Sequence, residues 1–484
     1  MLTNFNKLEK QFGHHGIEEL RQNLSIYLDE MRNFGTYYLV LDASDNYIKT
    51  VTDKGWKHHV GLLGKGIKKI KERLDVRVSY ILIFGGNEII PMPVFPNPNQ
   101  NGNDTDVDSD LPYSTLSASN PMEKEDARTP LVPVGRIPTG VNSSVNDLCL
   151  LMGNTLEGIT NFSTDRTFGL STYCWQKVSD AVNRSVCKDS LYISPGLTIS
   201  NVHEHYADDS TVHYFNLHGS DKAPDWYGQK EDDYPVAFSP KVIAQNKKHN
   251  IVGVEACYGA RFINLKKEDS VLLSALASKT VSFVGSSRVA WGPSAPPMNL
   301  ADIVIHDFLA LMQRGVPAGE AFRQARLHAF ANSKDNDPST SLLTMMEFNL
   351  FGDPAFAINS INGKAISSKE IAGKPFGVDG DDVNEFSDDE VEQAGKTSSS
   401  ETSIYSMVSQ AVDGAQQRIT ELINKQVWEK YPEFKDIHPK LIKYKFQGKT
   451  YNSLTYTKKN DFFDSHLLVS TDETGRITNE CTSK

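Results

Sequence analysis

Two residues whose types suit nucleophilic catalysis follow two successive apolar runs. His218 comes directly after the apolar run at residues 212–217, and Cys257 comes directly after the run at residues 251–256. In open α/β sheets, reacting groups lie beyond the carboxyl ends of the strands. If the two runs are neighbouring parallel strands, an imidazole and a thiol meet at one edge of the sheet.

Such a pair can carry out acyl transfer. A thiol of ordinary pKa is only slightly ionised at neutral pH, and a nearby histidine can take its proton during attack. The same imidazole can then protonate a leaving amine. Gly219 has no side chain, so its N–H can approach a substrate carbonyl, and we expect it to form an oxyanion hole with the N–H of Cys257.

Competing interpretations of these polar residues are weaker. A lone cysteine at a strand end is commonly a small buried apolar residue, and a lone His-Gly is commonly a loop. A polar segment with His203, Glu204, His205, Asp208, Asp209 and His213 contains metal-ligand types, but it lacks the HExxH spacing. We interpret that segment as a loop, and we expect neither a metal nor a cofactor.

Composition restricts the class of protein. The 484 residues carry a net charge of -11, which argues against nucleic-acid binding because phosphates require clustered basic residues. No apolar run is long enough to span a membrane, and the polar N-terminus has no apolar core of a secretory signal. The five cysteines are scattered and show no CxxC spacing, which favours a reducing, cytoplasmic location.

Strand and helix patterns alternate through the first 358 residues. In residues 1–164 we expect strands at 37–42, 78–86 and 131–136, a helix at 65–73 and a long loop at 97–120. In residues 165–358 we expect strands at 168–174, 212–217, 251–256 and 281–284, with helices at 270–277, 300–314 and 318–331. This order predicts a mostly parallel sheet covered by helices on both faces.

The composition changes after residue 358. Residues 359–401 are acidic and poor in apolar side chains, which predicts a flexible linker. In residues 402–484 we expect a helix at 404–423, a hairpin of strands 442–446 and 450–456, and a third strand at 465–470. We expect this small α+β domain to bind a protein regulator or to hold a zymogen inactive, with Lys443, Lys445 and Lys449 of the hairpin entering an acidic pocket.

Several segments resemble the gingipains, cysteine peptidases that share a caspase-like fold with caspases, legumain, clostripain and separase. His218-Gly219-Ser220 followed by Trp226 is similar to the family's His-Gly segment, and residues 255–259 are similar to its Ala-Cys segment. Further similar segments follow the family's order: Tyr80 to Gly86 with Ile90-Pro91, Asp108 to Tyr113, Val134 to Pro138, and Phe351 to Pro354.

The resemblance implies a three-layer fold with two α/β subdomains, the second carrying a His218–Cys257 dyad. It implies an endopeptidase acting on peptides or proteins, and it places Trp291 and Met298 at the P1 pocket. Asp180 is the candidate acid for a basic P1 side chain, while Trp175 or Gln176 stands where the family has an acid supporting the histidine. Two alternatives stay open: a scaffold that binds a partner without cutting it, and a peptide ligase using the same dyad.

Overall fold

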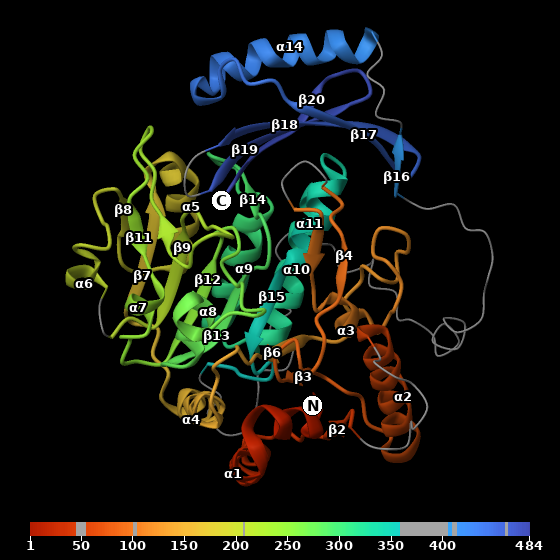
Figure 1. The fold of residues 1–484 in the computed structure, drawn as a ribbon, viewed down its shortest axis with the longest axis vertical. Coiled ribbons are helices and arrows are strands. Elements are labelled where there is room, and N and C mark those ends of the chain that lie inside the picture. The colour runs from red at the N-terminus through yellow and green to blue at the C-terminus, as the bar shows by residue number, and fades with distance from the viewer. Residues whose placement is uncertain (45–54, 100–103, 207–208, 359–404, 409–413, 460–462) are drawn as a thin grey trace.

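The computed structural model describes all residues except 45–54, 100–103, 207–208, 359–404, 409–413 and 460–462. The expected acidic linker at 359–401 therefore lies outside the described residues. One ten-stranded sheet forms the centre of the molecule (Figure 1). Its strands, from edge to edge, are β2 (Leu41–Asp42), β1 (Leu2–Thr3), β3 (Ile81–Phe84), β6 (Val134–Ile137), β15 (Phe348–Gly352), β13 (Thr280–Ser286), β12 (Asn250–Val254), β9 (Val212–Asn216), β7 (Thr167–Thr172) and β8 (Leu191–Ser194).

Helices cover both faces of this sheet, as the alternation of strands and helices predicts. A β-carbon at Gly253 of β12 would touch Ile305 and Leu309 of α9 (Ala301–Gln313). On the opposite face, Gly158 of α4 (Val145–Asn161) lies against Val281 of β13. Further helices are α1 (Phe5–Asn33), α2 (Trp56–Leu74), α5 (Gln176–Val186), α7 (Pro240–Ile243), α8 (Val271–Leu276), α10 (Ala318–Ser333) and α11 (Pro338–Glu347). The predicted three-layer α/β class is confirmed.

Both α/β blocks contribute to this one sheet. β15, at the end of the second block, lies between β6 of the first block and β13, and it runs antiparallel to β13. The other pairings between neighbouring strands of this sheet are parallel. The two blocks are therefore joined by backbone hydrogen bonds as well as by side-chain packing.

Two expectations for the first block were wrong. Residues 37–42 form only the short strand β2, with Tyr37 75% exposed, because β2 is at the sheet edge and pairs with β1 alone. The expected loop at 97–120 contains β5 (Asp106–Asp108), which pairs with β4 (Val94–Pro96), and the short helix α3 (Leu111–Thr115).

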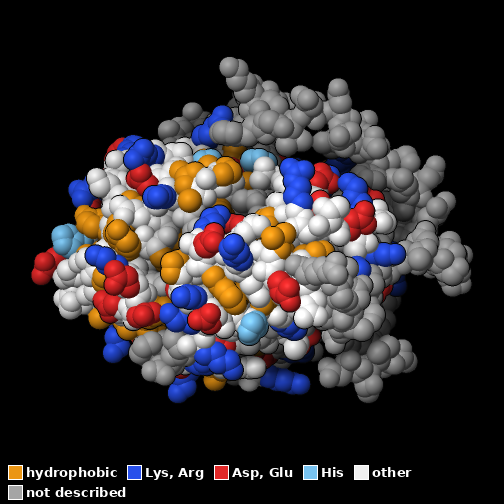
Figure 2. Space-filling view, turned by 90° about the horizontal axis from the view of Figure 1, so that it is seen from above, with side chains coloured by type: hydrophobic (Ala, Val, Ile, Leu, Met, Phe, Trp, Pro, Cys, Tyr) orange, Lys and Arg blue, Asp and Glu red, His pale blue; other side chains and the backbone are white. Residues whose placement is uncertain are grey.

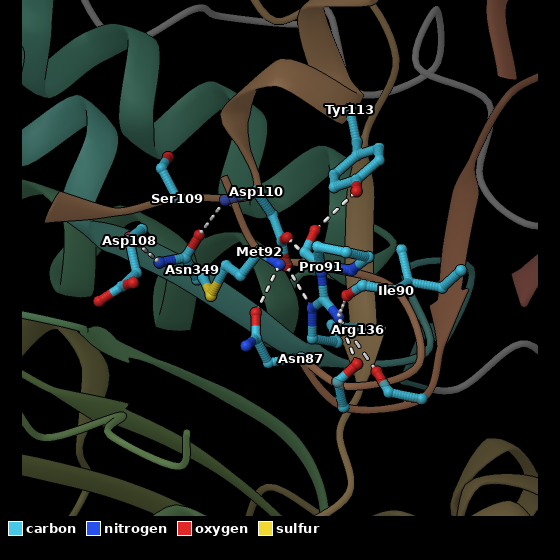
Figure 3. A network of polar contacts seen from close by, with 12 residues as sticks. Asn87, Ile90, Pro91, Met92, Asp108, Ser109, Asp110, Tyr113, Arg136 and Asn349 are labelled. Carbon is cyan, nitrogen blue, oxygen red and sulfur yellow. Dashed lines mark hydrogen bonds and ion pairs between the residues drawn. The ribbon is translucent and has the colours of Figure 1, made fainter. Parts of the chain in front are cut away.

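The segments that resemble the gingipains in the first block meet at Arg136 (Figure 3). Its guanidinium is fully buried and makes two hydrogen bonds to Asp110, of 2.8 and 2.6 Å. It also donates to the carbonyl of Ile90 at 2.8 Å, and the Tyr113 hydroxyl donates to the carbonyl of Pro91 at 2.7 Å. These residues brace the loops around β3 and β6, and their role is structural.

The last part of the chain forms a second sheet above the carboxyl ends of β9 and β12 (Figure 1). Its strands are β16 (Tyr405–Val408), β17 (Lys440–Phe446), β18 (Lys449–Lys459), β19 (Asp464–Asp472) and β20 (Ile477–Ser483), with β14 (Trp291–Gly292) of the second block added at its edge. The helix α14 (Gly414–Lys430) packs on this sheet. The predicted hairpin and third strand are confirmed. The predicted helix at 404–423 is wrong at its start, because residues 405–408 pair with β17 as a strand. β20 was not predicted.

Figure 2 shows the molecule from the side of this second sheet, where acidic and basic side chains of the described residues are intermixed with small apolar patches. Among the described residues, none of the helices has the length and apolar character needed to cross a bilayer.

Candidate active site

The pairing of β9 with β12 brings His218 and Cys257 to the same edge of the sheet. The two strands are parallel neighbours, with Phe215 opposite Val254. Each candidate residue lies three positions beyond its member of this pair, so the two residues leave the sheet at the same level. They line one pocket together with Gly219, as the sequence predicts.

A tight turn holds Cys257 at the end of β12. Tyr258 follows it with φ +54°, a left-handed conformation that is uncommon for a large side chain. The Tyr258 N–H donates to the carbonyl of Arg288 at 2.8 Å, and its hydroxyl donates to Asp104 at 2.7 Å. These bonds stabilise the turn, which aims the backbone N–H of Cys257 into the pocket rather than along the strand.

Gly219 lies directly against this turn. A β-carbon at Gly219 would overlap the carbonyl oxygen of Cys257, so only glycine fits at this position. This close approach explains why a glycine follows His218. The role of the Gly219 N–H as an oxyanion donor stays a prediction.

The His218 imidazole lies between aromatic rings and is bonded to a neutral side chain. Its ring centroid is 4.3 Å from that of Trp175 and 4.5 Å from that of Phe463, with which it is stacked. His218 Nε2 is 2.7 Å from Oε1 of Gln229. Gln229 Nε2 donates to the Tyr234 hydroxyl, which orients the amide so that its oxygen faces the histidine. The histidine therefore carries its proton on Nε2, and Nδ1 is left as the acceptor.

Burial keeps both members of the dyad uncharged in this state. His218 is 3% exposed and Cys257 is 5% exposed. Desolvation lowers the pKa of His218 to about 3, against the opposing effect of the Gln229 hydrogen bond. Desolvation also raises the pKa of the Cys257 thiol well above its ordinary value. The structure therefore holds a thiol and a neutral imidazole.

The last residues of the chain occupy the pocket. β20 pairs antiparallel with β14 (Trp291–Gly292), with Ser483 opposite Trp291 and Thr482 opposite Gly292. Lys484 continues this pairing by donating its N–H to the carbonyl of Ala290 at 2.9 Å. The Lys484 carbonyl oxygen accepts a hydrogen bond of 2.8 Å from the N–H of Cys257. The backbone oxygen of Lys484 is thus held at the predicted oxyanion donor.

The side chain of Lys484 is fully enclosed. Its Nζ lies 3.4 Å from Oδ1 of Asp302 and 3.6 Å from Oε2 of Glu255, and it donates to the carbonyl of Pro293 at 3.1 Å. The same nitrogen lies 4.7 Å from the ring centroid of Trp175. Desolvation, followed by the adjacent Asp302 carboxylate, raises the pKa of Glu255 well above its ordinary value, and the Lys484 ammonium opposes this effect.

The predicted P1 residues are only partly at this pocket. Asp180 lies on α5 and pairs with Arg184, so its assignment as the P1 acid is wrong. Trp291 contributes its backbone to the pairing with β20, whereas its side chain packs in a cluster with Leu468 and Cys481. Adjacent strand residues face opposite sides, so Gly292, not Trp291, faces Lys484. Met298 packs against the main core of the molecule.

Other expectations for the site are also corrected. The position after β7 that could support His218 is taken by Trp175 through ring contact, and the hydrogen-bond partner is Gln229 from a different segment. In the hairpin with Lys443, Lys445 and Lys449, Tyr444, Phe446 and Tyr451 form a cluster with Met122, and the segments at the pocket are instead Phe463 and β20 with Lys484.

In the polar segment before β9, residues 202–205 form the short helix α6 (Val202–His205) rather than a loop. In the part of the chain that the structure describes, no group of three His, Cys, Asp or Glu side chains has an arrangement that could hold a metal ion. The His213 imidazole is fully buried and lies 3.0 Å from the Ser210 hydroxyl. Asp208 lies outside the described residues.

Gln229, Asp302 and Lys484 were missed by sequence reasoning. Gln229 is brought to His218 by a backbone bridge between His218 and Tyr227, and a weak signal for it is the Trp226-Tyr227-Gly228 segment that follows the histidine. Asp302 is in the first turn of α9, where an acidic side chain commonly interacts favourably with the helix dipole and so does not indicate a binding site. Lys484 has no local signal at all.

Comparisons with known proteins show a gingipain-like fold. Residues 159–359 match the model of peptidase family C25, and this segment contains both His218 and Cys257. The crystal structure of the Arg-specific cysteine proteinase gingipain R is similar, with a TM-score of 0.52, 12% identity and 96% of each chain covered. A complex of the pro- and mature domains of this enzyme from Porphyromonas gingivalis matches with a TM-score of 0.51, 12% identity, 96% of this chain and 97% of that chain. No curated protein matches the sequence.

Proposed function

We propose that this chain, which has a gingipain-like fold and a segment matching peptidase family C25, is a cysteine endopeptidase with Cys257 as nucleophile and His218 as general base and acid. The observation that carries the proposal is that the two residues lie at the same level beyond paired strands, with the backbone oxygen of Lys484 on the N–H of Cys257. A substrate's P1 carbonyl would take the place of the Lys484 carbonyl.

In this mechanism Nδ1 of His218 accepts the thiol proton while the Cys257 sulfur attacks the P1 carbonyl carbon. The oxyanion is stabilised by the N–H of Cys257 and, as predicted, by that of Gly219. The imidazolium then protonates the leaving amine, which releases the C-terminal product and leaves a thioester. Water, deprotonated by the same imidazole, hydrolyses the thioester and restores the free thiol.

The P1 preference in this proposal is for a basic side chain. Asp302 and Glu255 are fully buried and stand at the end of the pocket that receives Lys484. A buried carboxylate requires a counter-charge, so a P1 ammonium is favoured over an apolar or acidic side chain. Asp302 thus replaces Asp180 as the residue that selects the charge.

The non-catalytic scaffold is the second candidate, and it is favoured by one observation. Gln229 offers no negative charge to an imidazolium, so it stabilises the protonated intermediate less than a carboxylate would. A peptidase hydrolyses peptides and a scaffold does not, so an activity assay distinguishes the two candidates.

Incubation of the full chain with a mixed peptide library and added glycinamide tests the proposal by mass spectrometry. We expect hydrolysis products ending in a basic residue, and their complete loss in Cys257→Ala. Cys187→Ala is the matched control, since Cys187 is also a buried thiol but packs in the main core. Products extended by glycinamide would identify a ligase. The absence of any product from both the wild type and Lys484→Ala would contradict the proposed activity.

A further inference from the structure

We propose that β20 with Lys484 is an intramolecular pseudosubstrate that fills the P1 subsite and holds the enzyme latent. The inference rests on the proposed function and adds the occupant of the site and its regulation. Three independent contacts carry it: the strand pairing with β14, the carbonyl on the N–H of Cys257, and the ammonium in the acidic pocket.

The backbone of β20 is bound in the manner of an added strand. Residues 482–484 run antiparallel to residues 290–292 and exchange main-chain hydrogen bonds with them. Strand addition of this kind gives affinity through the backbone and specificity through pockets for alternate side chains. Thr482 and Lys484 share one face, where the Trp175 indole N–H donates to the Thr482 hydroxyl at 3.1 Å.

The pocket suits an ammonium in shape and in charge. Nζ of Lys484 donates to Oδ1 of Asp302 and to the carbonyl of Pro293, and Oε2 of Glu255 lies 3.6 Å away. A β-carbon at Gly292 would come within 2.5 Å of Cε of Lys484, so glycine leaves the space for the side chain. Without this lysine, the negative charge of the Asp302–Glu255 pair would be buried and unpaired.

The contacts of this segment exclude any other peptide from the site. The N–H of Cys257 is already bonded to Lys484, and the edge of β14 is already paired with β20. Phe463, just before β19 of the same domain, stacks on His218. Because the blocking segment belongs to the chain, it competes at a high effective concentration with free substrate.

Two full-length variants test this latch, which consists of β20 with Lys484 bound in the pocket. Lys484→Ala removes the buried ammonium, and Lys449→Ala, at the exposed β17–β18 turn, is the matched control. We measure kcat/KM on a short fluorogenic peptide with P1 lysine, and separately the rate at which iodoacetamide alkylates Cys257, located by mass spectrometry. We expect both rates to rise by about tenfold or more in Lys484→Ala and to be unchanged in Lys449→Ala.

The two readouts separate this inference from the proposed function. Faster alkylation without turnover in any variant would support the latch and contradict the peptidase. Turnover that is equal in the wild type and in Lys484→Ala, with equal alkylation, would overturn the latch and leave the peptidase standing.

A second measurement covers the case in which Lys484→Ala is inactive through misfolding. A synthetic peptide of residues 479–484 is added to the wild-type chain and to Lys484→Ala, and alkylation of Cys257 is followed. We expect protection of Lys484→Ala by this peptide, and at least tenfold weaker protection by the same peptide ending in alanine. Equal protection by the two peptides would overturn the assignment of the pocket to lysine.

Discussion

At the scale of single residues, the imidazole of His218 is oriented by an amide where a carboxylate could stand. Oε1 of Gln229 accepts a hydrogen bond of 2.7 Å from Nε2 of His218, and the Gln229 amide is held in turn by its hydrogen bond to the Tyr234 hydroxyl. This arrangement selects the tautomer in which Nδ1 is the acceptor of the ring, but it adds no charge to stabilise an imidazolium. Gln229 is therefore a positioning residue whose effect should be visible in the pKa of His218.

Gln229→Glu should raise the pKa of His218 from about 3, because a carboxylate at hydrogen-bond distance favours the protonated ring. Gln229→Ala should lower kcat roughly 10- to 100-fold with little change in KM, because the ring loses its orienting partner. NMR titration of labelled histidine measures the first effect, and steady-state kinetics measures the second. Gln417→Glu, on the exposed surface of α14, is the control. An unchanged His218 titration in Gln229→Glu would contradict this role.

At the scale of elements, the short strand β14 joins the catalytic core to the C-terminal sheet. The described strands of that sheet follow the order β14, β20, β19, β18, β17 and β16, so the sheet begins with two residues of the catalytic part. His466 of β19 donates its N–H to the hydroxyl of Ser483, and its ring lies 6.0 Å from that of Trp291. The junction, formed by the pairing of β14 with β20, therefore lies near two buried histidines: His218 on the side of the catalytic pocket and His466 in β19 of the second sheet.

Acidification should open this junction. Burial lowers the pKa of His218 to about 3 and that of His466 to about 4, and both return towards about 6.5 when exposed. The closed state thus keeps its full stability above pH 6.5. It loses about 1.4 kcal/mol per histidine for each pH unit below 6.5, until the buried groups themselves protonate. The other groups facing His218 are Gln229, Tyr234 and the Lys484 ammonium, whose charge also disfavours protonation.

Hydrogen–deuterium exchange measures this opening. After correction for the intrinsic rate, amides of β20 should exchange faster at pH 5 than at pH 7.5. Amides of β3, in the buried main sheet, should show equal protection at the two pH values. Equal protection of β20 at both pH values would show that the two histidines do not control the closed state.

At the scale of the whole molecule, one sheet and one buried ion pair join the parts of the catalytic core. β6 and β15 connect the two α/β blocks, and Arg136 in β6 ties the loop after β3 to Asp110. Asp110 also receives support from Asn349 in β15, whose Oδ1 accepts from the Asp110 N–H at 2.9 Å. None of these hydrogen bonds involves His218 or Cys257, and the network maintains the scaffold on which the two residues are placed.

Asp110→Ala should therefore destabilise the protein without acting on the chemistry directly. It leaves the fully buried Arg136 guanidinium without its counter-ion, which costs about 3–5 kcal/mol in comparable buried pairs. Urea unfolding followed by tryptophan fluorescence measures the loss. Asp106→Ala, on the exposed side of β5, should change the free energy of unfolding by less than about 0.5 kcal/mol. A small effect of Asp110→Ala would contradict the bracing role.

The sequence alone was sufficient to predict that His218 and Cys257 meet at one edge of the sheet, with Gly219 beside them, and to predict the strands that carry them. Buried strands and helices leave periodic apolar patterns, and catalytic residues at strand ends stand at the points where these patterns stop. The strand pairing then brought the histidine and the cysteine level with each other, as predicted. The hairpin of β17 and β18 was also readable, because its turn and alternation are local.

Only the tertiary structure decided what surrounds this dyad. Gln229, Asp302 and Lys484 reach the pocket from three distant parts of the chain, and strand alternation turned Gly292 rather than Trp291 towards the lysine. No local pattern encodes such contacts, because a buried polar side chain is selected by partners far away in sequence. Asp302, which pairs with Lys484, could therefore not be found from the sequence near Asp180, and the strand that enters the pocket had no signal beyond its own short alternation.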